Sequence, residues 1–507
     1  MFVNRRFLLI SLLLLVPICI SAQNFNIPST WQVNTSSIAR NDRIKIAENA
    51  LRKVLGASSG TNPNSHSAAA TASLLATLAL NDWITGNSAY NTTVATILHK
   101  FSASHLNFQR RSNHWVQNPL NSDTLLWGLA SFYAHRAYNC SLYLDTAVGV
   151  WNYAHQFFIT EDQAAHGVQP TRNFTLRPQC NGHSLAGGVY FVPDVQSDDR
   201  VNTETVGAFL TLSAYLLEIT SNKTYQDAAN LSAAFIQNHL SKTVIFDTLN
   251  TSTCETNQGT FSYNSGFAIE GFAVLGNASS NETWTNLAHQ LVATAVLFPT
   301  WTDPTGVIIE GAVSHRMFVL TENLTDLVDA KNGFKRIFVR ALHEVWSRNP
   351  QDSPIAEFIA SYLTVQFNSI LSVATIPQSD VYSPFWKGPP PVSGKLDALS
   401  QVITSYALNS AINLPVSASR TSEPERCIPL TIAPALQLIT NISGNPSGAS
   451  GLATPPTSTS SKHSAAAAVI VGGVIGGLAS SSSYSADADA TATVTSNLNI
   501  RLSTLGR

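Results

Sequence analysis

Apolar residues recur every three or four positions along most of the chain between residues 36 and 414, and runs that alternate every second position are few. A spacing of three and four predicts helices with one apolar face. The clearest helical segments are residues 68–80, 125–138, 205–219, 267–275, 337–346 and 358–371. The pattern therefore predicts an all-α domain.

The predicted helices follow one another in pairs that are joined by a recurrent turn. In the clearest joints, polar residues lead to an aromatic residue and then to an alanine-rich helix, as in residues 86–95, 139–147, 221–229 and 281–288. We count about six such helical hairpins. Two architectures accommodate them, a closed ring of two helix layers, which is an (α/α)6 barrel, and an open α-solenoid.

The N-terminus has the pattern of a secretory signal peptide. Arg5 and Arg6 precede the apolar residues 7–20, and small residues follow up to Ala22. This order predicts cleavage after Ala22. An uncleaved membrane anchor is the alternative, but it requires a longer apolar span. We therefore expect residues 1–22 to be a signal peptide and residues 23–440 to form the helical domain.

The composition changes towards the C-terminus. Residues 441–464 are rich in Ser, Thr, Pro and Gly, which predicts a linker without a core. Residues 465–479 are apolar and carry small residues at four-residue spacing, but a bilayer span needs about 20 residues. They are interpreted as a truncated membrane segment, a weak GPI signal or part of a flexible tail. We expect residues 480–507 to be disordered.

Cysteines and glycosylation sequences are typical of a secreted glycoprotein. Four of the five cysteines remain after loss of the signal peptide, which favours two disulfides in one of three pairings: Cys140, Cys180, Cys254 and Cys427. Asn-x-Ser/Thr acceptor sequences are dense and are expected at the surface: Asn34, Asn91, Asn139, Asn173, Asn222, Asn230, Asn250, Asn277, Asn281, Asn323 and Asn441.

The charge composition argues against several classes of partner. Only 12% of the residues are charged, the net charge is -2, and there is no basic patch, so we expect no nucleic-acid binding. No cysteine or histidine cluster has zinc-ligand spacing, and no glycine-rich phosphate loop follows a strand. We therefore expect neither a metal nor a cofactor, and a neutral, polar partner.

Five short motifs follow one another along the helical domain. They are Ser122-Asp123-Thr124-Leu125-Leu126-Trp127-Gly128-Leu129, Gly187-Gly188-Val189-Tyr190-Phe191, Val201-Asn202-Thr203-Glu204-Thr205-Val206, Ser262-Tyr263-Asn264-Ser265-Gly266 and Gly306-Val307-Ile308-Ile309-Glu310. In this order they resemble glycoside hydrolase family 76, the endo-α-1,6-mannanases and related fungal wall proteins, over residues 40–415. The resemblance implies an (α/α)6 barrel with a groove where the inner helices begin. It also implies retaining hydrolysis of α-1,6-mannan by two adjacent aspartates.

The resemblance places Ser122-Asp123 at the family's pair of aspartates. It assigns the general acid/base role to Asp123 and leaves an uncharged serine at the position of the nucleophile. Helix capping is the alternative explanation for this segment, because Asn121 or Ser122 would cap a helix and Asp123 would suit its first turn.

Another acid is required if the protein is an enzyme. Glu204 is the preferred second catalytic carboxylate, because it lies in the first turn of a motif helix. Glu270 and Glu310 are the less favoured alternatives.

Further motif residues are candidates for binding sugar. Aromatic rings stack on pyranose faces, and asparagine and serine side chains form hydrogen bonds with hydroxyl groups. The predicted substrate-binding residues are Ser122, Trp127, Tyr190, Asn202, Tyr263, Asn264 and Trp301. The alternatives are core packing for the aromatic residues and helix capping for the asparagines.

Two functions are compatible with these motifs. The leading hypothesis is a glycoside hydrolase or transglycosidase that acts on α-1,6-linked mannan or related α-mannosyl glycans of the fungal cell wall. The alternative is a catalytically reduced mannan-binding or cell-wall structural protein on the same barrel. A second carboxylate near Asp123 would favour the enzyme. We expect a monomer that is secreted, extracellular or in the cell wall, with membrane or wall attachment through the C-terminal tail.

Overall fold

The computed structural model describes residues 23–57, 68–104, 120–310, 323–390 and 396–417. The predicted signal peptide, linker, apolar segment and tail lie outside these residues. Within the described part, no helix is both long enough and apolar enough to cross a membrane.

Helices dominate the described residues. Their bounds are α1 Arg40–Ala57, α2 Ala68–Thr85, α3 Asn91–Ser104, α4 Asn121–Tyr138, α5 Ser141–His155, α6 Glu161–His166, α7 Thr203–Thr220, α8 Lys223–Phe235, α9 Ser262–Ser279, α10 Glu282–Ala295, α11 Asn323–Arg348, α12 Pro354–Val373 and α13 Ala398–Ala411. A π-helical turn, Ile236–Leu240, continues α8. Every segment that the apolar spacing predicted as a helix lies within one of these helices.

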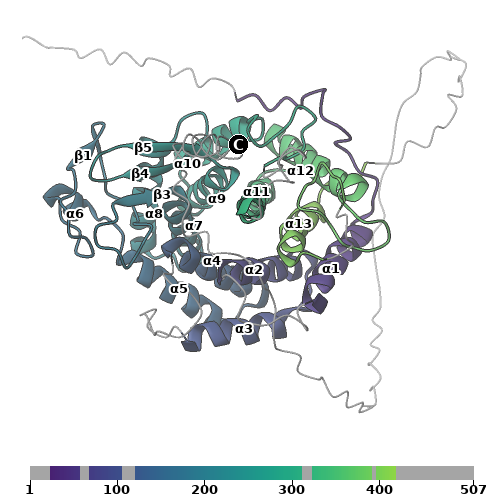
Figure 1. Cartoon of the computed structure of the whole chain (residues 1–507), viewed down its shortest axis with the longest axis horizontal. Coiled ribbons are helices and arrows are strands. Elements are labelled where there is room, and N and C mark those ends of the chain that lie inside the picture. Colours follow the sequence, from purple (N-terminus) through teal and green to yellow (C-terminus); the bar gives the residue numbers. More distant parts are fainter. Residues whose placement is uncertain (1–22, 58–67, 105–119, 311–322, 391–395, 418–507) are drawn as a thin grey trace, which may run out of the picture. The chain divides into compact units, whose positions relative to one another are not determined.

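The helices form a closed ring of two layers. Helices α2, α4, α7, α9, α11 and α13 each pack against the next, and α13 packs against α2 (Figure 1). Helices α1, α3, α5, α8, α10 and α12 pack on the outside of this ring. The closure between α13 and α2 rules out the open solenoid. The fold is therefore the predicted (α/α)6 barrel.

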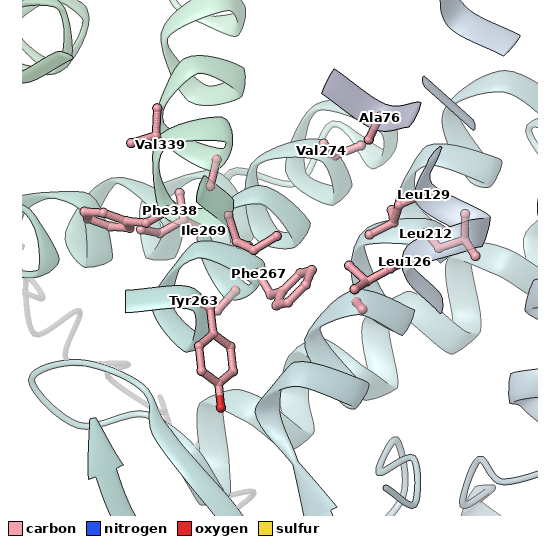
Figure 2. Close-up of a cluster of buried hydrophobic side chains, with 14 of the residues drawn as sticks. Ala76, Leu126, Leu129, Leu212, Tyr263, Phe267, Ile269, Val274, Phe338 and Val339 are labelled. Atoms are coloured by element: carbon pink, nitrogen blue, oxygen red, sulfur yellow. The ribbon is translucent and has the colours of Figure 1, made fainter. Parts of the chain in front are cut away.

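The inner helices are apolar on most of their surface and approach closely. In Figure 2, Leu126 of α4, Leu212 of α7 and Phe267 of α9 lie in one buried cluster. Gly207 on α7 faces Phe267, and a Cβ at this glycine would lie only 2.7 Å from the Phe267 Cβ. Small residues therefore permit the short distances between neighbouring inner helices.

Two small antiparallel sheets occur where the spacing predicted few strands. One pairs β1 Gln179–Cys180 with β2 His183–Ser184, and the other has the order β3 Arg200–Asn202, β4 Phe246–Asn250 and β5 Thr256–Thr260. Strand β3 runs directly into α7, and β5 ends two residues before α9. The three-stranded sheet thus holds the starts of two neighbouring inner helices. The strands were missed because they are short and β5 is polar.

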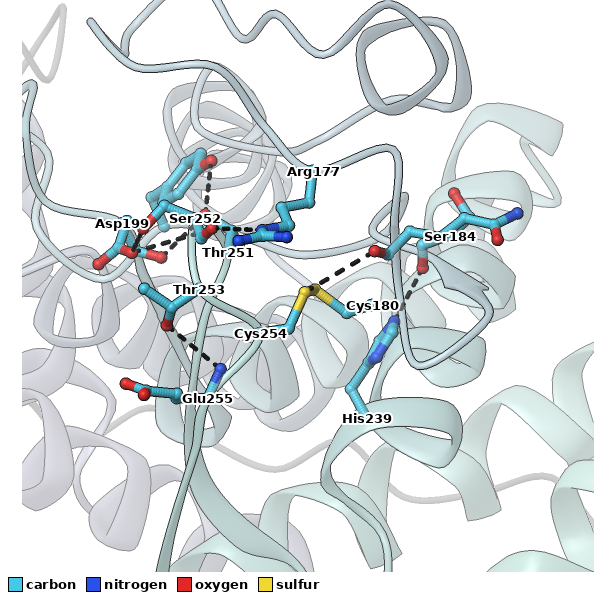
Figure 3. The surroundings of a disulfide bond; sticks show 12 residues. Arg177, Cys180, Ser184, Asp199, His239, Thr251, Ser252, Thr253, Cys254 and Glu255 are labelled. Atoms are coloured by element: carbon cyan, nitrogen blue, oxygen red, sulfur yellow. Dashed lines mark hydrogen bonds between the residues drawn. A yellow bond between two sulfur atoms is a disulfide. The ribbon is translucent and has the colours of Figure 1, made fainter.

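One disulfide joins the two small sheets to each other. Cys180 at the end of β1 is bonded to Cys254 in the turn between β4 and β5 (Figure 3). Cys140 forms no disulfide with another described residue, and Cys427 lies outside the described part. One of the two expected disulfides is therefore present, and the second remains a prediction.

The predicted glycosylation sequences lie at the surface wherever the structure describes them. The acceptor asparagines that are exposed or partly exposed are Asn34, Asn91, Asn139, Asn173, Asn222, Asn230, Asn250, Asn277 and Asn281. Asn323 and Asn441 lack a described side-chain environment. Glycosylation itself remains a prediction.

Candidate functional site

The first turns of three neighbouring inner helices bring the predicted site residues to one end of the barrel. Asp123 lies in the first turn of α4, Glu204 in that of α7, and Tyr263 and Asn264 in that of α9. Helix α7 packs against both α4 and α9. The charge of Asp123 acts directly on Glu204, so the two carboxyl groups are neighbours.

Neither Asn121 nor Ser122 caps the start of α4, whereas Asp123 occupies its first turn as the capping alternative expected. Helix α4 begins at Asn121, and its N-cap is Leu120, which makes no side-chain cap. Asn121 instead donates its Nδ2–H to the Tyr190 carbonyl at 2.7 Å. The predicted capping by Asn121 or Ser122 is therefore wrong. Asp123 accepts a hydrogen bond from the Leu120 backbone N–H, which helps to fix the start of α4.

The environment gives Asp123 and Glu204 different proton affinities. Burial raises the pKa of Asp123 to about 6, although the Arg336 charge opposes the rise. Burial and the negative charge of Asp123 raise the pKa of Glu204 to about 8. Arg336 and the nearby Ser122 hydroxyl act in the opposite direction on Glu204. Between these values the pair holds one proton, which resides mainly on Glu204.

Arg336, which the sequence reasoning missed, is the cation of this site. It belongs to α11, donates its Nε–H to the Ser73 Oγ at 3.1 Å, and donates from Nη1 to the Gly333 carbonyl. Neither acceptor is charged. Its charge lowers the pKa of both Asp123 and Glu204.

Arg336 is the first member of a charged stripe on α11. Arg336, Arg340, Glu344 and Arg348 recur at four-residue intervals, which places them on one face of the helix. Such a stripe in a buried helix was the sequence signal that could have identified Arg336.

The other two arginines on this face of α11, Arg340 and Arg348, form ion pairs with carboxylates other than Asp123 and Glu204. Arg340 forms an ion pair with Glu270 at 2.7 Å. Arg348 pairs with Glu344 at 2.8 Å and with Glu218 at 2.6 Å. Among the described residues, the counter-charges of Arg336 are Asp123 and Glu204. The positive charge of Arg336 is therefore balanced by one negative charge, that of the Asp123 carboxylate, while Glu204 keeps its proton and is neutral.

The alternative acids have other partners. Glu270 is fully buried and accepts hydrogen bonds from the hydroxyls of Tyr133 and Tyr215 as well as from Arg340. This network keeps Glu270 in the barrel interior and does not support it as the second catalytic acid.

Glu310 secures the start of α9. Its Oε1 accepts the Ser262 backbone N–H at 2.9 Å, and its other oxygen accepts the Ser262 hydroxyl. This contact explains why an acid follows the Gly306 turn and gives Glu310 a structural role.

Asp247 is a third carboxylate near the pair, and the sequence reasoning missed it. It lies on β4, and its Oδ1 accepts hydrogen bonds from the Tyr263 hydroxyl at 2.8 Å and from the Asn264 Nδ2 at 3.2 Å. Its charge contributes to the raised pKa of Glu204. No motif marked Asp247, because a short polar strand has no distinctive spacing.

Two predicted sugar-stacking residues are core residues instead. Tyr190 is fully buried, its hydroxyl lies 3.2 Å from the Thr251 hydroxyl, and Arg172 covers its ring. Trp301 is also fully buried and donates its Nε1–H to the Ala295 carbonyl at 2.8 Å. A ring with no exposed surface cannot stack on a pyranose. The prediction that Tyr190 and Trp301 contact substrate is therefore wrong.

Two further predicted substrate-binding residues make contacts within the protein: Asn202 caps a helix, and Trp127 stacks on another ring. Asn202 is the N-cap of α7, where its Oδ1 accepts the Thr205 backbone N–H at 3.1 Å, so its capping alternative holds. Trp127 is 7% exposed, and its ring stacks on Phe101 with the centroids 4.1 Å apart.

Several buried polar atoms in the first two turns of α4, α7 and α9 have no hydrogen-bond partner among the described residues. Such atoms are normally satisfied in folded proteins. Those without a hydrogen-bond partner among the described residues include Trp127 Nε1, Thr205 Oγ1 and Asn264 Oδ1. A ligand rich in hydroxyl groups suits this arrangement. The described residues contain no cluster of potential metal ligands.

A closed (α/α)6 barrel with a carboxyl pair where its inner helices begin has the architecture of a glycosidase. Residues 41–361 match the family model for glycosyl hydrolase family 76, so the chain belongs to this family.

Solved structures of the family share the fold. An inactive variant of the α-1,6-mannanase GH76A of Salegentibacter sp. HEL1_6, with two adjacent aspartates replaced by asparagine and α-1,6-mannotriose bound, is 16% identical. It matches over 74% of this chain and 100% of its own, with a TM-score of 0.57. Dfg5 from Chaetomium thermophilum in complex with glucosamine is 17% identical over 75% of this chain and 92% of its own, with a TM-score of 0.51. Comparison with curated proteins gave no significant match.

Proposed function

We propose that this protein is a glycosidase that cleaves α-1,6-linked mannan, with Asp123 and Glu204 as its two catalytic carboxyl groups. The observation that carries the proposal is the coupled pair, in which burial and mutual charge hold one proton on Glu204 beside an ionised Asp123. The choice of mannan follows the family and the mannotriose bound by the Salegentibacter mannanase variant.

The proton distribution assigns a role to each acid. Glu204, protonated at neutral pH, gives its proton to the glycosidic oxygen as the bond to the anomeric carbon breaks. The Asp123 carboxylate attacks the anomeric carbon and forms a glycosyl ester. Glu204, now ionised, takes a proton from water, which then hydrolyses the ester with retention of configuration. These roles reverse the acid/base assignment that the resemblance gave to Asp123.

The proposal is tested by hydrolysis of α-1,6-mannotetraose with the full mature chain across the pH range. We expect a bell-shaped profile of kcat/KM with limbs near pH 6 and pH 8. Asp123→Asn and Glu204→Gln should each lower kcat by roughly 10³-fold, because each removes one half of the acid pair. Glu255→Gln removes an exposed carboxylate from the nearby turn and should leave the rate unchanged.

The serine at position 122, where the family carries an aspartate, makes a mannan-binding protein without activity the alternative to be tested. Ser122 is fully buried at the position where the family carries an aspartate, so this chain draws its second acid from α7. Calorimetric binding of mannotetraose by the wild type without any turnover would favour the binding protein over the enzyme. Products longer than the substrate, formed with added mannobiose as acceptor, would identify a transglycosidase.

We also propose that the protein acts outside the cell or in the cell wall. The signal-peptide pattern and the surface-exposed glycosylation sequences support an extracellular or cell-wall protein. Wall mannan would then be the accessible polymer.

A further inference from the structure

The Cys180–Cys254 disulfide is a covalent link between two small sheets with separate attachments to the helices (Figure 3). Cys254 lies in the turn between β4 and β5, in the sheet whose strand β3 runs into α7. Cys180 ends β1, and on the paired strand β2 the Ser184 carbonyl accepts the His239 Nε2–H at 2.8 Å. His239 belongs to the π-helical turn that continues α8. The bond therefore joins the sheet that leads into α7 to a hairpin that is held at the end of α8.

The two sulfur atoms of this disulfide differ in their access to solvent. Cys180 is fully buried, whereas Cys254 is partly exposed and lies between the exposed residues Thr253 and Glu255. In thiol–disulfide exchange, a thiolate attacks one sulfur and displaces the other, and access helps to decide which sulfur is attacked. An external thiolate therefore reaches Cys254, and Cys180 becomes the leaving group.

An imidazole ring is placed beside the leaving sulfur. Cys180 and His183 are directly opposite partners of the β1–β2 pair, on either side of Asn181 and Gly182, which both have a positive φ. Opposite residues of an antiparallel pair point to the same face of the sheet, with their Cβ atoms about 5 Å apart. His183 is exposed, and a histidine next to a cysteine stabilises its thiolate. The hairpin thus supplies a stabilising group for the thiolate that forms when the disulfide opens.

Contacts other than the disulfide hold the two cysteines near each other. The Asp199 carboxylate accepts the Ser252 hydroxyl and, at 3.3 Å, the Ser252 backbone N–H, while the Asp199 carbonyl accepts the Thr251 N–H at 2.9 Å. Arg177, three residues before Cys180, donates its Nε–H to the Ser252 carbonyl at 2.7 Å. These bonds do not depend on the S–S bond, so the opened sulfurs stay close enough to join again.

We propose that Cys180–Cys254 is a reversible thiol–disulfide exchange site for an external dithiol, with Cys254 as the attacked sulfur and His183 beside the leaving sulfur. A thiolate of the dithiol bonds to Cys254 Sγ while the S–S bond breaks, and the electron pair of that bond leaves on Cys180 Sγ. The second thiolate of the reagent attacks the mixed disulfide and releases Cys254. The protein disulfide gains two electrons, the dithiol becomes a disulfide, and both cysteines take protons that the dithiol released to water.

This exchange site is separate from the acid pair and does not rest on the proposed glycosidase activity. Its test treats the folded, full mature chain with dithiothreitol near neutral pH and follows the opening by alkylation and peptide mass spectrometry. We expect the bond to open while circular dichroism shows an intact helical fold, and to close again with oxidised glutathione.

Histidine variants test the group beside the leaving sulfur. His183→Gln should slow the opening by about five- to tenfold, because it removes the side chain that stabilises the departing thiolate. His99→Gln is the matched control and should stay within about twofold of the wild type, because His99 is also exposed but lies on α3. Equal rates for the two variants would overturn the role of His183.

Reduced glutathione, which is a monothiol, tests the direction of attack. Its adduct, trapped by rapid alkylation, should lie on Cys254, with Cys180 alkylated. An adduct on Cys180 would overturn the assignment of the leaving group. A disulfide that opens only after the protein has unfolded would overturn the exchange site itself.

Discussion

Arg336 shows how one side chain determines the charge state of the proposed site. The charged and titratable groups that act on its guanidinium are Asp123 on α4, Glu204 on α7, Arg340 on α11 and Tyr406 on α13. Two of these groups are the acids, and Arg340 is already paired with Glu270. Arg336 therefore stabilises the ionised form of Asp123 more than any other described group does.

Replacing Arg336 by Gln should shift the pH dependence of mannan hydrolysis. The Arg336 charge lowers the pKa of Asp123, so its loss raises that pKa above its present value of about 6. The acidic limb of kcat/KM should then move to higher pH by at least about one unit, and activity near pH 6 should fall most. Arg336→Lys keeps the charge and should restore part of the shift. An acidic limb that stays in place in Arg336→Gln would contradict this role.

At the scale of helices, glycines determine how closely the inner layer packs. Gly266 lies in the second turn of α9, against the backbone of α11. A Cβ at this position would come within 2.9 Å of the Phe338 Cα and N atoms. Backbone atoms of a long helix cannot move aside as a flexible side chain can. The α9–α11 contact therefore requires glycine at position 266.

Gly266→Ala should destabilise the protein by about 1–3 kcal/mol, because it forces two inner helices apart. The measurement is the free energy of unfolding in urea. Gly56→Ala on α1 is the matched control, since nothing lies within 4 Å of its Cβ position. In an open helical position, alanine should be neutral or stabilising by up to about 1 kcal/mol. Equal stability changes for the two variants would refute close packing as the reason for Gly266.

At the scale of the whole described domain, the ring is closed by contacts between the first and last helices. Arg43 of α1 is 1% exposed and donates to the carbonyls of Ala411 and Leu414 at 2.8 Å and 2.9 Å. Asn81 of α2 donates to the Asn409 side chain of α13 at 2.8 Å. These bonds connect segments more than 300 residues apart in the sequence.

Arg43→Met should lower the free energy of unfolding by about 2–4 kcal/mol, because it leaves several buried carbonyls without a donor. Thermal unfolding of the variant beside Lys45→Met checks this expectation. Lys45 lies on the same helix with 71% of its side chain exposed, so its replacement should change stability by less than about 0.5 kcal/mol. A stable Arg43→Met protein would mean that apolar packing alone closes the ring.

The helices were predictable because their signal is local. Spacing of apolar residues located five of the six inner helices, all except α13, and the motif order placed Asp123, Glu204, Tyr263 and Asn264 at helix starts. The polar strands β4 and β5 lacked such a signal, so Asp247 was missed. Tyr190 and Trp301 failed as binding residues because burial depends on which segments cover a side chain, and neighbouring sequence does not specify this.

The sequence by itself determined the helical hairpins, the likeness to family 76 and the presence of Ser122 directly before Asp123, since each is written in the order of residues. Only the tertiary structure decided that Glu204 and Arg336 join Asp123, because ring closure brings together helices that are far apart in the chain. The proton on Glu204 is likewise a tertiary property. It arises from burial and from the charges of residues on other elements, and neither exists until the barrel has formed.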